Sequence, residues 1–257
     1  MHAGVCKTEE EARRMAWRNF MEFSKTTVEM LKMGQVINPK NCRERIELVC
    51  SDAVRERFFN PGKSENAIIV TCHSGNWEIS AVAYNEYSGL KLMSVRRKMS
   101  NLKLDSLFYE RNSEQHTSCE KQGAVRPLMK MLHQKQSIAL LVDQHASNRE
   151  GGVMTTFFGQ PARTHITPAR MHLKTKVPII VLVLRRVEKR GYYQMIVNDP
   201  IDYVKTGDEV KDIESLTQAY TTQLENFIGE KPEEWLWAHR RWTNLNRDRK
   251  VSVEDQA

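Results

Sequence analysis

The fold of this chain is decided by the stretch Ala67-Ile-Ile-Val-Thr-Cys-His-Ser-Gly-Asn-Trp-Glu78. Its first six residues form a short apolar run, which predicts a buried strand. The Ser-Gly-Asn triplet then makes a turn, and the residues from Glu78 to Tyr87 read as a helix. A buried strand that leads through a turn into a helix is the opening of a β-α-β unit.

The same alternation continues along the rest of the chain. We expect further strands at Leu90–Arg96, Ile138–Val142, Ile179–Leu184 and Tyr192–Val197. We expect helices at Asn101–Arg111, Ala124–Gln134, Thr167–Thr175 and Ser215–Gly229. Strands that alternate with helices predict a single α/β domain with a mixed, mostly parallel central sheet flanked by helices. Ligands of such sheets bind where strands end at the carboxyl edge.

The first sixty residues differ in character and are predicted to be helical. Apolar residues at three- and four-residue spacing predict a helix from Glu9 to Lys32, and a second helix is expected from Cys42 to Phe59. We therefore expect residues 1–60 to pack as a helical segment on the main domain, residues 61–245. Residues 246–257, of mixed charge, are expected to form a frayed tail.

Composition narrows the class of protein. The chain has 257 residues, with 39 Lys and Arg against 32 Asp and Glu, and the resulting charge of +7 favours anionic partners. Its five cysteines are scattered and form no C-x-x-C pair, which argues against a disulfide scaffold or a zinc site and fits a reducing compartment. The apolar runs are too short to span a membrane, so the chain as given is expected to be soluble or peripheral.

His73 and Glu78 are the first candidates for chemistry. On a continuous helix, five residues rotate two side chains by roughly 140°, but a strand, turn and helix would let Glu78 turn back towards the imidazole. A carboxylate there would fix the tautomer of a catalytic histidine. The amides of Ser74, Gly75 and Asn76 would suit a phosphate or an oxyanion. The alternative is that Glu78 caps the helix and His73 is an ordinary turn residue.

Several blocks of sequence carry a resemblance to a known family. The stretch from Thr71 to Glu78 resembles the H-x4-[D/E] motif of glycerolipid-type acyltransferases. More narrowly, it is similar to the H-x-G-N-W-E form of the bacterial lipid A biosynthesis acyltransferases, the lauroyl/myristoyl type, and of their relatives that acylate phosphatidylinositol mannosides. Further blocks follow in the family's order: Leu141–Gln144, Gly151–Ala162, Thr167–Arg170, Val177–Arg186 and Pro232–Trp242.

The resemblance implies a fold like that of glycerol-3-phosphate acyltransferase and an O-acyltransferase activity. A fatty acyl group would pass from a thioester of acyl carrier protein or coenzyme A to a hydroxyl of an anionic glycolipid, such as a lipid A precursor. His73 would be the general base, oriented by Glu78, and the alkoxide would attack the thioester directly. No metal or redox cofactor is implied. The expected place is the cytoplasmic face of the bacterial inner membrane, with the protein bound peripherally to the membrane surface.

The resemblance also implies residues that bind substrate. An arginine and an aspartate downstream of the histidine match Arg111 and Asp143, and arginines of the later blocks are candidates for contacts with acidic head groups. The complete set is Arg111, Asp143, Gln144, Ser74, Gly75, Asn76, Arg163 and Arg170, with Arg185 and Arg186 as further head-group candidates. Alternatively, Arg111 only ends a helix, Asp143 caps local amides, and the other arginines are solvated.

Two aromatic segments have two interpretations each. The loop or hairpin around Phe157 and Phe158 could line an acyl groove or pack in the core. The rings of Trp235, Trp237 and Trp242, beside His239, Arg240 and Arg241, could form an interfacial belt or belong to a packed helix with one basic face.

The sequence departs from the family pattern at its start and in Thr164–Pro168. Relatives usually begin with a hydrophobic anchor of about twenty residues; here we expect either a truncated N-terminus or docking through surface groups. Thr164–Pro168 lacks the usual glycine, a change that is expected to reshape the donor pocket. Three other functions stay open: a hydrolase of acyl thioesters, an acyltransferase that acts on phospholipids or phosphatidylinositol mannosides, and a basic nucleic-acid-binding module. The interspersed acidic residues and the absence of an RNA-binding or zinc-finger signature argue against nucleic acid as a partner.

Overall fold

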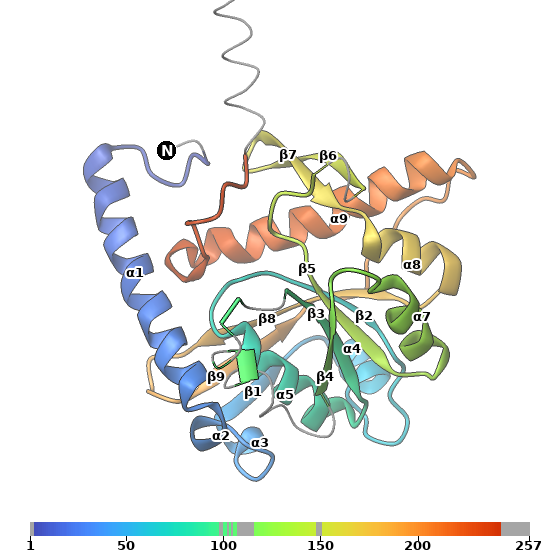
Figure 1. Cartoon of the computed structure of the whole chain (residues 1–257), viewed down its shortest axis with the longest axis horizontal. Coiled ribbons are helices and arrows are strands. Elements are labelled where there is room, and N and C mark those ends of the chain that lie inside the picture. Colours follow the sequence, from blue (N-terminus) through green and yellow to red (C-terminus); the bar gives the residue numbers. More distant parts are fainter. Residues whose placement is uncertain are drawn as a thin grey trace, which may run out of the picture.

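A seven-stranded sheet forms the centre of the protein (Figure 1). The computed structural model describes residues 3–97, 100–101, 103, 105–106, 116–147 and 151–242. The strands lie in the order β1-β9-β8-β2-β5-β3-β4, and only β8 and β9 run antiparallel to each other. Their bounds are β1 Ile46–Val49, β2 Ile68–Thr71, β3 Leu92–Arg96, β4 His116–Glu120, β5 Ser137–Leu141, β8 Ile179–Arg186 and β9 Tyr193–Val197. The predicted fold, a single α/β domain with a mostly parallel mixed sheet, is confirmed.

Helices cover both faces of this sheet and bury two hydrophobic clusters. On one face α7, α8 and α9 pack on alternate residues of the central strands, and on the other face α3, α4 and α5 do so. The long helix α1 stands along one side of the molecule (Figure 1). The bounds are α1 Glu9–Leu31, α2 Met33–Val36, α3 Cys42–Arg45, α4 Asp52–Phe58, α5 Trp77–Ser88, α7 Val125–His133, α8 Thr167–Thr175 and α9 Glu209–Glu230.

The helix predicted from Cys42 to Phe59 is wrong. The segment is instead α3, then strand β1, then α4. The side chains of Ile46 and Leu48 are buried while Glu47 and Val49 are exposed, which is the two-residue period of a strand, and β1 pairs in parallel with β9. Pairing with a strand nearly 150 residues away overrides the local helical pattern. Part of the first sixty residues therefore belongs to the sheet.

The remaining elements follow the predicted order. The hairpin of β6, Gly152–Phe157, and β7, Gln160–His165, lies where a loop or hairpin was expected. Strand β4 was not predicted, because its sequence His-Thr-Ser-Cys-Glu has no apolar alternation and lies at the sheet edge. Most of the helix expected at Asn101–Arg111, and the tail from residue 246, lie outside the described residues.

The register of β2 and β5 decides what meets at the carboxyl edge. The two strands are parallel neighbours, and Thr71 pairs with Leu141. Two residues beyond this pair come His73 on one strand and Asp143 on the other. Because both strands end at the same edge of the sheet, the pairing brings the side chains of His73 and Asp143 together.

Candidate active site

His73 and Asp143 form the centre of the candidate site. Imidazole Nδ1 lies 2.9 Å from Asp143 Oδ1, and the backbone N–H of His73 donates to Asp143 Oδ2 over 2.9 Å. The Nε1–H of Trp235 donates to the same Oδ2 over 2.8 Å. Asp143 is only 2% exposed. An ionised carboxylate only accepts hydrogen bonds, so it holds the neutral imidazole with its proton on Nδ1, which leaves Nε2 as the basic nitrogen.

Burial and charge act in opposite directions on this pair. Burial lowers the pKa of His73, but the charge of Asp143, the hydrogen bond to it and the charge of Glu78 outweigh burial and raise that pKa above 6.5. Burial alone would raise the pKa of Asp143, whereas its interactions with His73 and the hydrogen bond from Trp235 lower it below its usual range. Asp143 therefore stays ionised and His73 is a stronger base than a free imidazole.

Asp143, and not Glu78, orients the imidazole. The carboxylate of Glu78 accepts a hydrogen bond from Trp77 Nε1 over 3.1 Å, and it reaches His73 only through its charge. Burial raises the pKa of Glu78. No hydrogen bond joins Glu78 to His73, so the predicted role of Glu78 in holding the imidazole is not seen, and β5 supplies the carboxylate that bonds to the ring.

The turn after His73 does not offer free amides. The N–H of Ser74 donates to the carbonyl of Cys72, that of Gly75 to Glu234 and that of Asn76 to Leu184. The predicted cradle of these three amides for a phosphate or an oxyanion is therefore wrong, because the protein already uses them. The side chain of Asn76 caps α5 at Ile79 N, as expected for an asparagine before a helix.

Gly75 is required where this turn meets β8. Its φ is +60°, and a Cβ there would lie 2.0 Å from the carbonyl oxygen of Leu184. We expect Gly75→Ala to lower the free energy of unfolding by about 3 kcal/mol or more, since backbone cannot yield as a flexible side chain can. Urea denaturation would measure this loss. Gly62→Ala is the matched control: it also has positive φ, +85°, but nothing lies within 4 Å of the added carbon, so a loss as large there would contradict the steric argument.

Gln144 and His239 stand beside the pair. The Nε2 atom of Gln144 lies 3.5 Å from both ring nitrogens of His73 and 2.7 Å from Nε2 of His239. The rings of His73 and His239 are 5.5 Å apart between centroids. Burial and the charge of a protonated His73 lower the pKa of His239. This second imidazole therefore stays neutral while His73 carries a proton.

The C-terminal block, Pro232–Trp242, packs against the residues of the site. Trp235 is 1% exposed and its ring packs on Phe157, while the buried guanidinium of Arg241 donates to the carbonyls of Gln144 and Arg163. Of this block, only Pro232–Glu234 is helical, as a short 3-10 turn. The helix with a basic face is wrong, and the interfacial belt does not fit Trp235. The rings of Trp235, Trp237 and Trp242 pack in or against the hydrophobic core, and Trp235 also donates the hydrogen bond to Asp143.

The predicted arginines occupy different settings. Arg163 is half-buried and donates to the carbonyl of Gly152, whereas Arg170 is exposed on α8. Arg185 pairs with Glu230 over 2.5 Å and Arg186 with Glu29 over 2.7 Å, so the expected head-group role does not fit these two. Arg111 lies outside the described residues.

Sequence reasoning missed the site roles of Trp235 and His239. Both lie in the block Pro232–Trp242, which was interpreted as an interfacial belt or a basic helix. Their contacts with Asp143 and Gln144 join residues about ninety positions apart. The presence of this segment among the family blocks indicated a functional role. It did not indicate which residues Trp235 and His239 contact.

Two kinds of feature are missing from the residues that the structure describes. No three side chains of His, Cys, Asp or Glu within them gather closely enough to hold a metal ion. Within the same residues, no helix combines the length and the apolar character needed to cross a bilayer.

The fold and the site define a class of α/β proteins with a histidine–carboxylate pair at the carboxyl edge of the sheet, an arrangement typical of general acid–base enzymes. Comparison with known families then identifies the chain: the model of the bacterial lipid A biosynthesis acyltransferases matches residues 4–244, and the chain belongs to this family. It is an O-acyltransferase, as the resemblance predicted.

Solved structures are also similar to this chain. The crystal structure of the 1-acyl-sn-glycerophosphate (LPA) acyltransferase, PlsC, from Thermotoga maritima is similar, with 13% identity and a TM-score of 0.40. The match covers 83% of this chain and 97% of that one. No curated protein matches the chain.

Proposed function

We propose that the protein transfers a fatty acyl group from a thioester to a hydroxyl of an anionic glycolipid, such as a lipid A precursor. The thioester is that of acyl carrier protein or coenzyme A, and the reaction takes place at the cytoplasmic face of the bacterial inner membrane. The observation that carries the proposal is the His73–Asp143 pair at 2.9 Å, with Nε2 left to act on substrate.

The geometry supports direct transfer in two steps. Nε2 of His73 takes the proton of the acceptor hydroxyl while its oxygen bonds to the thioester carbonyl carbon. The imidazolium that forms is stabilised by Asp143 through Nδ1. The tetrahedral intermediate then breaks its C–S bond, and the departing sulfur takes the proton from Nε2. An ester and a thiol result, the base is regenerated, and neither a metal nor a redox cofactor is used.

Substrate contacts in this proposal come from the residues around the pair. The amide of Gln144 lies where it can donate to a substrate held at Nε2. Arg163 and the exposed Arg170 follow on the hairpin and on α8, and Arg170 is free of the ion pairs that occupy Arg185 and Arg186. A guanidinium binds phosphate or carboxylate oxygens in pairs, which suits an anionic glycolipid. The proposed role of Arg111 rests on the family motif alone.

The long helix α1 supports the membrane surface as a partner. Its polar side faces the domain: the Asn19 side chain donates to the carbonyl of Glu233 over 2.8 Å, and Thr26 donates to that of Gly75 over 3.0 Å. Its outer side carries large apolar residues at helical spacing, which are Trp17, Phe20, Met21, Val28 and Leu31, each at least 42% exposed. A helix that turns apolar residues outward fits a bilayer interface.

The rings on α1 give a testable consequence. We expect Trp17→Ser with Phe20→Ser to reduce binding to phosphatidylglycerol vesicles by on the order of tenfold or more, because both rings lose apolar area buried in the interface. Vesicle sedimentation measures this. The matched control is Val204→Ser with Val210→Ser, two exposed apolar residues outside α1. Equal binding by the α1 variant and the wild type would exclude this surface.

Mass spectrometry of membrane lipids tests the proposed function. Cells that contain the protein should hold an anionic glycolipid heavier by one acyl group than the lipid of cells without it. Cells that express His73→Ala should match the cells without the protein. A single mass shift gives the acceptor and the chain length together. Identical lipid profiles in all three strains would reject the proposal.

A further inference from the structure

The positive charge of the chain is concentrated in two segments. Residues 121–142 and 160–187 together contain ten Lys and Arg residues and no Asp or Glu. The rest of the chain contains 29 Lys and Arg residues and 32 Asp and Glu residues. The whole charge excess therefore comes from these two segments. They include the helices α7 and α8, which pack against each other on the same face of the sheet (Figure 1).

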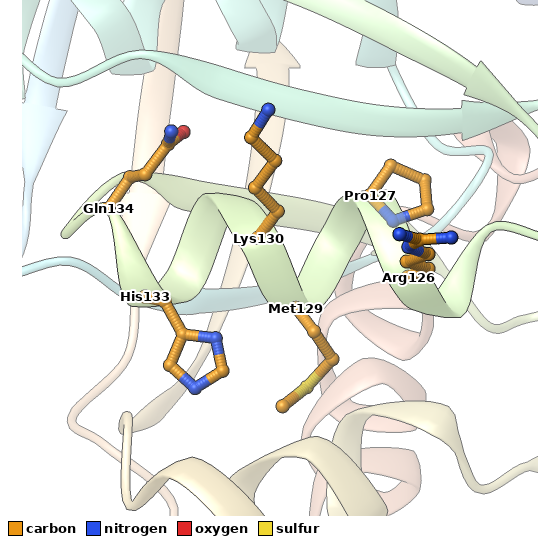
Figure 2. Close-up of a pocket in the computed structure, with 6 residues that line it drawn as sticks. All are labelled: Arg126, Pro127, Met129, Lys130, His133 and Gln134. Atoms are coloured by element: carbon orange, nitrogen blue, oxygen red, sulfur yellow. The ribbon is translucent and has the colours of Figure 1, made fainter.

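The basic side chains of these helices point into solvent. Arg126 and Lys130 on α7 and Arg170 and Lys174 on α8 are exposed, and no carboxylate of the described residues pairs with any of them. A hollow of about 660 Å³ lies along α7, lined by Arg126, Pro127, Met129, Lys130, His133 and Gln134. Figure 2 shows Lys130 and Gln134 on one side of α7, and Met129 and His133 on the other. We call this surface of α7 and α8 the basic face.

The basic face begins at the edge of the sheet that holds the site. Helix α7 follows the carboxyl end of β4, and α8 precedes the amino end of β8. Because the strands from β8 through β2, β5 and β3 to β4 run in parallel, Arg126 and Arg170 near the helix starts lie towards the edge of His73, and Lys174 lies towards the opposite edge. A body bound here has one end near the reacting groups.

We propose that the basic face docks a small acidic carrier protein that bears the acyl thioester on a flexible arm. This inference deepens the proposed function and rests on it. The charges are spread along two helices, as point contacts with an acidic helix require, and they do not converge on one centre as contacts with a nucleotide phosphate would. Met129 between them is a residue type favoured at protein interfaces.

The face differs from the surface proposed for lipid. Of the large apolar residues on α7 and α8, only Val125 is strongly exposed, so the aromatic rings that anchor a bilayer interface are missing from these two helices. The apolar side of α1 carries such rings and stands on the opposite side of the molecule in Figure 1. Acceptor and donor would therefore approach the edge of His73 from two different sides.

Charge reversal tests the docking. The variant Arg126→Glu with Lys130→Glu should bind the holo form of a bacterial acyl carrier protein at least about tenfold more weakly at low salt, because two attractions become repulsions. Fluorescence anisotropy measures binding without any turnover. KM for the acylated carrier should rise by a similar factor, while turnover of S-acyl-pantetheine, which lacks the acidic body, stays within about twofold. Raising the salt should weaken wild-type binding.

The control is Lys40→Glu with Lys63→Glu, which makes the same change in net charge at exposed residues outside the two helices. Arg126→Gln with Lys130→Gln provides a milder version if the reversal unfolds the chain. Unchanged binding in both face variants, or an equal loss in the control, would overturn the proposal. So would an equal rise of KM for acyl coenzyme A, which would point to a nucleotide site. Absence of transfer by the wild type from S-acyl-pantetheine, from the acylated carrier and from acyl coenzyme A alike would instead reject the proposed function, and anisotropy would still decide the docking.

Discussion

Replacing His73 by alanine should reduce acyl transfer by about 10² to 10⁴-fold, the range that general base catalysis contributes. The variant loses Nε2, the nitrogen that the bond from Nδ1 to Asp143 leaves basic and able to take the hydroxyl proton. The fold should survive, because Asp143 keeps the hydrogen bonds from the backbone of residue 73 and from Trp235. Initial rates with a saturating acyl thioester measure the loss, and thermal unfolding by circular dichroism checks the fold.

A second histidine supplies the control for this variant. His172 on α8 bonds to the carbonyl of Val177 and packs against Tyr203. His172→Ala should therefore retain transfer within a few fold. If His73→Ala kept a near-normal rate in a folded protein, the base would have to be another group.

Replacing Asp143 by asparagine should lower kcat by about 10²-fold or more, and it should also move the pH profile. In the wild type the raised pKa of His73 places the acid limb of kcat/KM at a higher pH than a free imidazole would, since only the neutral imidazole accepts a proton. Removing the carboxylate charge lowers that pKa, so the acid limb shifts to lower pH. The plateau falls because the asparagine amide can hold the wrong tautomer. Rates measured across pH separate the two effects.

Glu78→Gln is the matched comparison for Asp143→Asn. Its charge also raises the pKa of His73, but no hydrogen bond joins the two side chains. We therefore expect the acid limb to move in the same direction with most of the plateau retained. A larger fall of the plateau in Glu78→Gln than in Asp143→Asn would contradict the assignment of Asp143 as the orienting residue.

Local patterns predicted most of the fold. The apolar run before His73 forms a fully buried strand, Asn76 caps the next helix, and Thr167–Thr175 forms a helix with the predicted bounds. The exception is the segment around Ile46–Val49, where an edge pairing with β9 replaced a helix. Such a pairing depends on a distant strand, which a local pattern does not contain.

Of the residues in the site, the sequence predicted only those that belong to a recognisable motif. His73 was recognised from its strand end and from the family block, and Asp143 from the resemblance. Their direct bond depends on the register of Thr71 against Leu141 across seventy residues of sequence. The prediction favoured Glu78 because it is close in sequence. The turn amides were expected to be free because the partners that occupy them, at Leu184 and Glu234, come from remote segments.

The most direct test of the account follows a labelled acyl chain. Purified protein receives a radiolabelled acyl thioester with bacterial membrane lipid, and the products of the wild type and of His73→Ala are separated. We expect label in a lipid ester with the wild type and at most a trace with the variant. Label that appears only as free fatty acid, at the same rate with or without lipid, would show a hydrolase and contradict it.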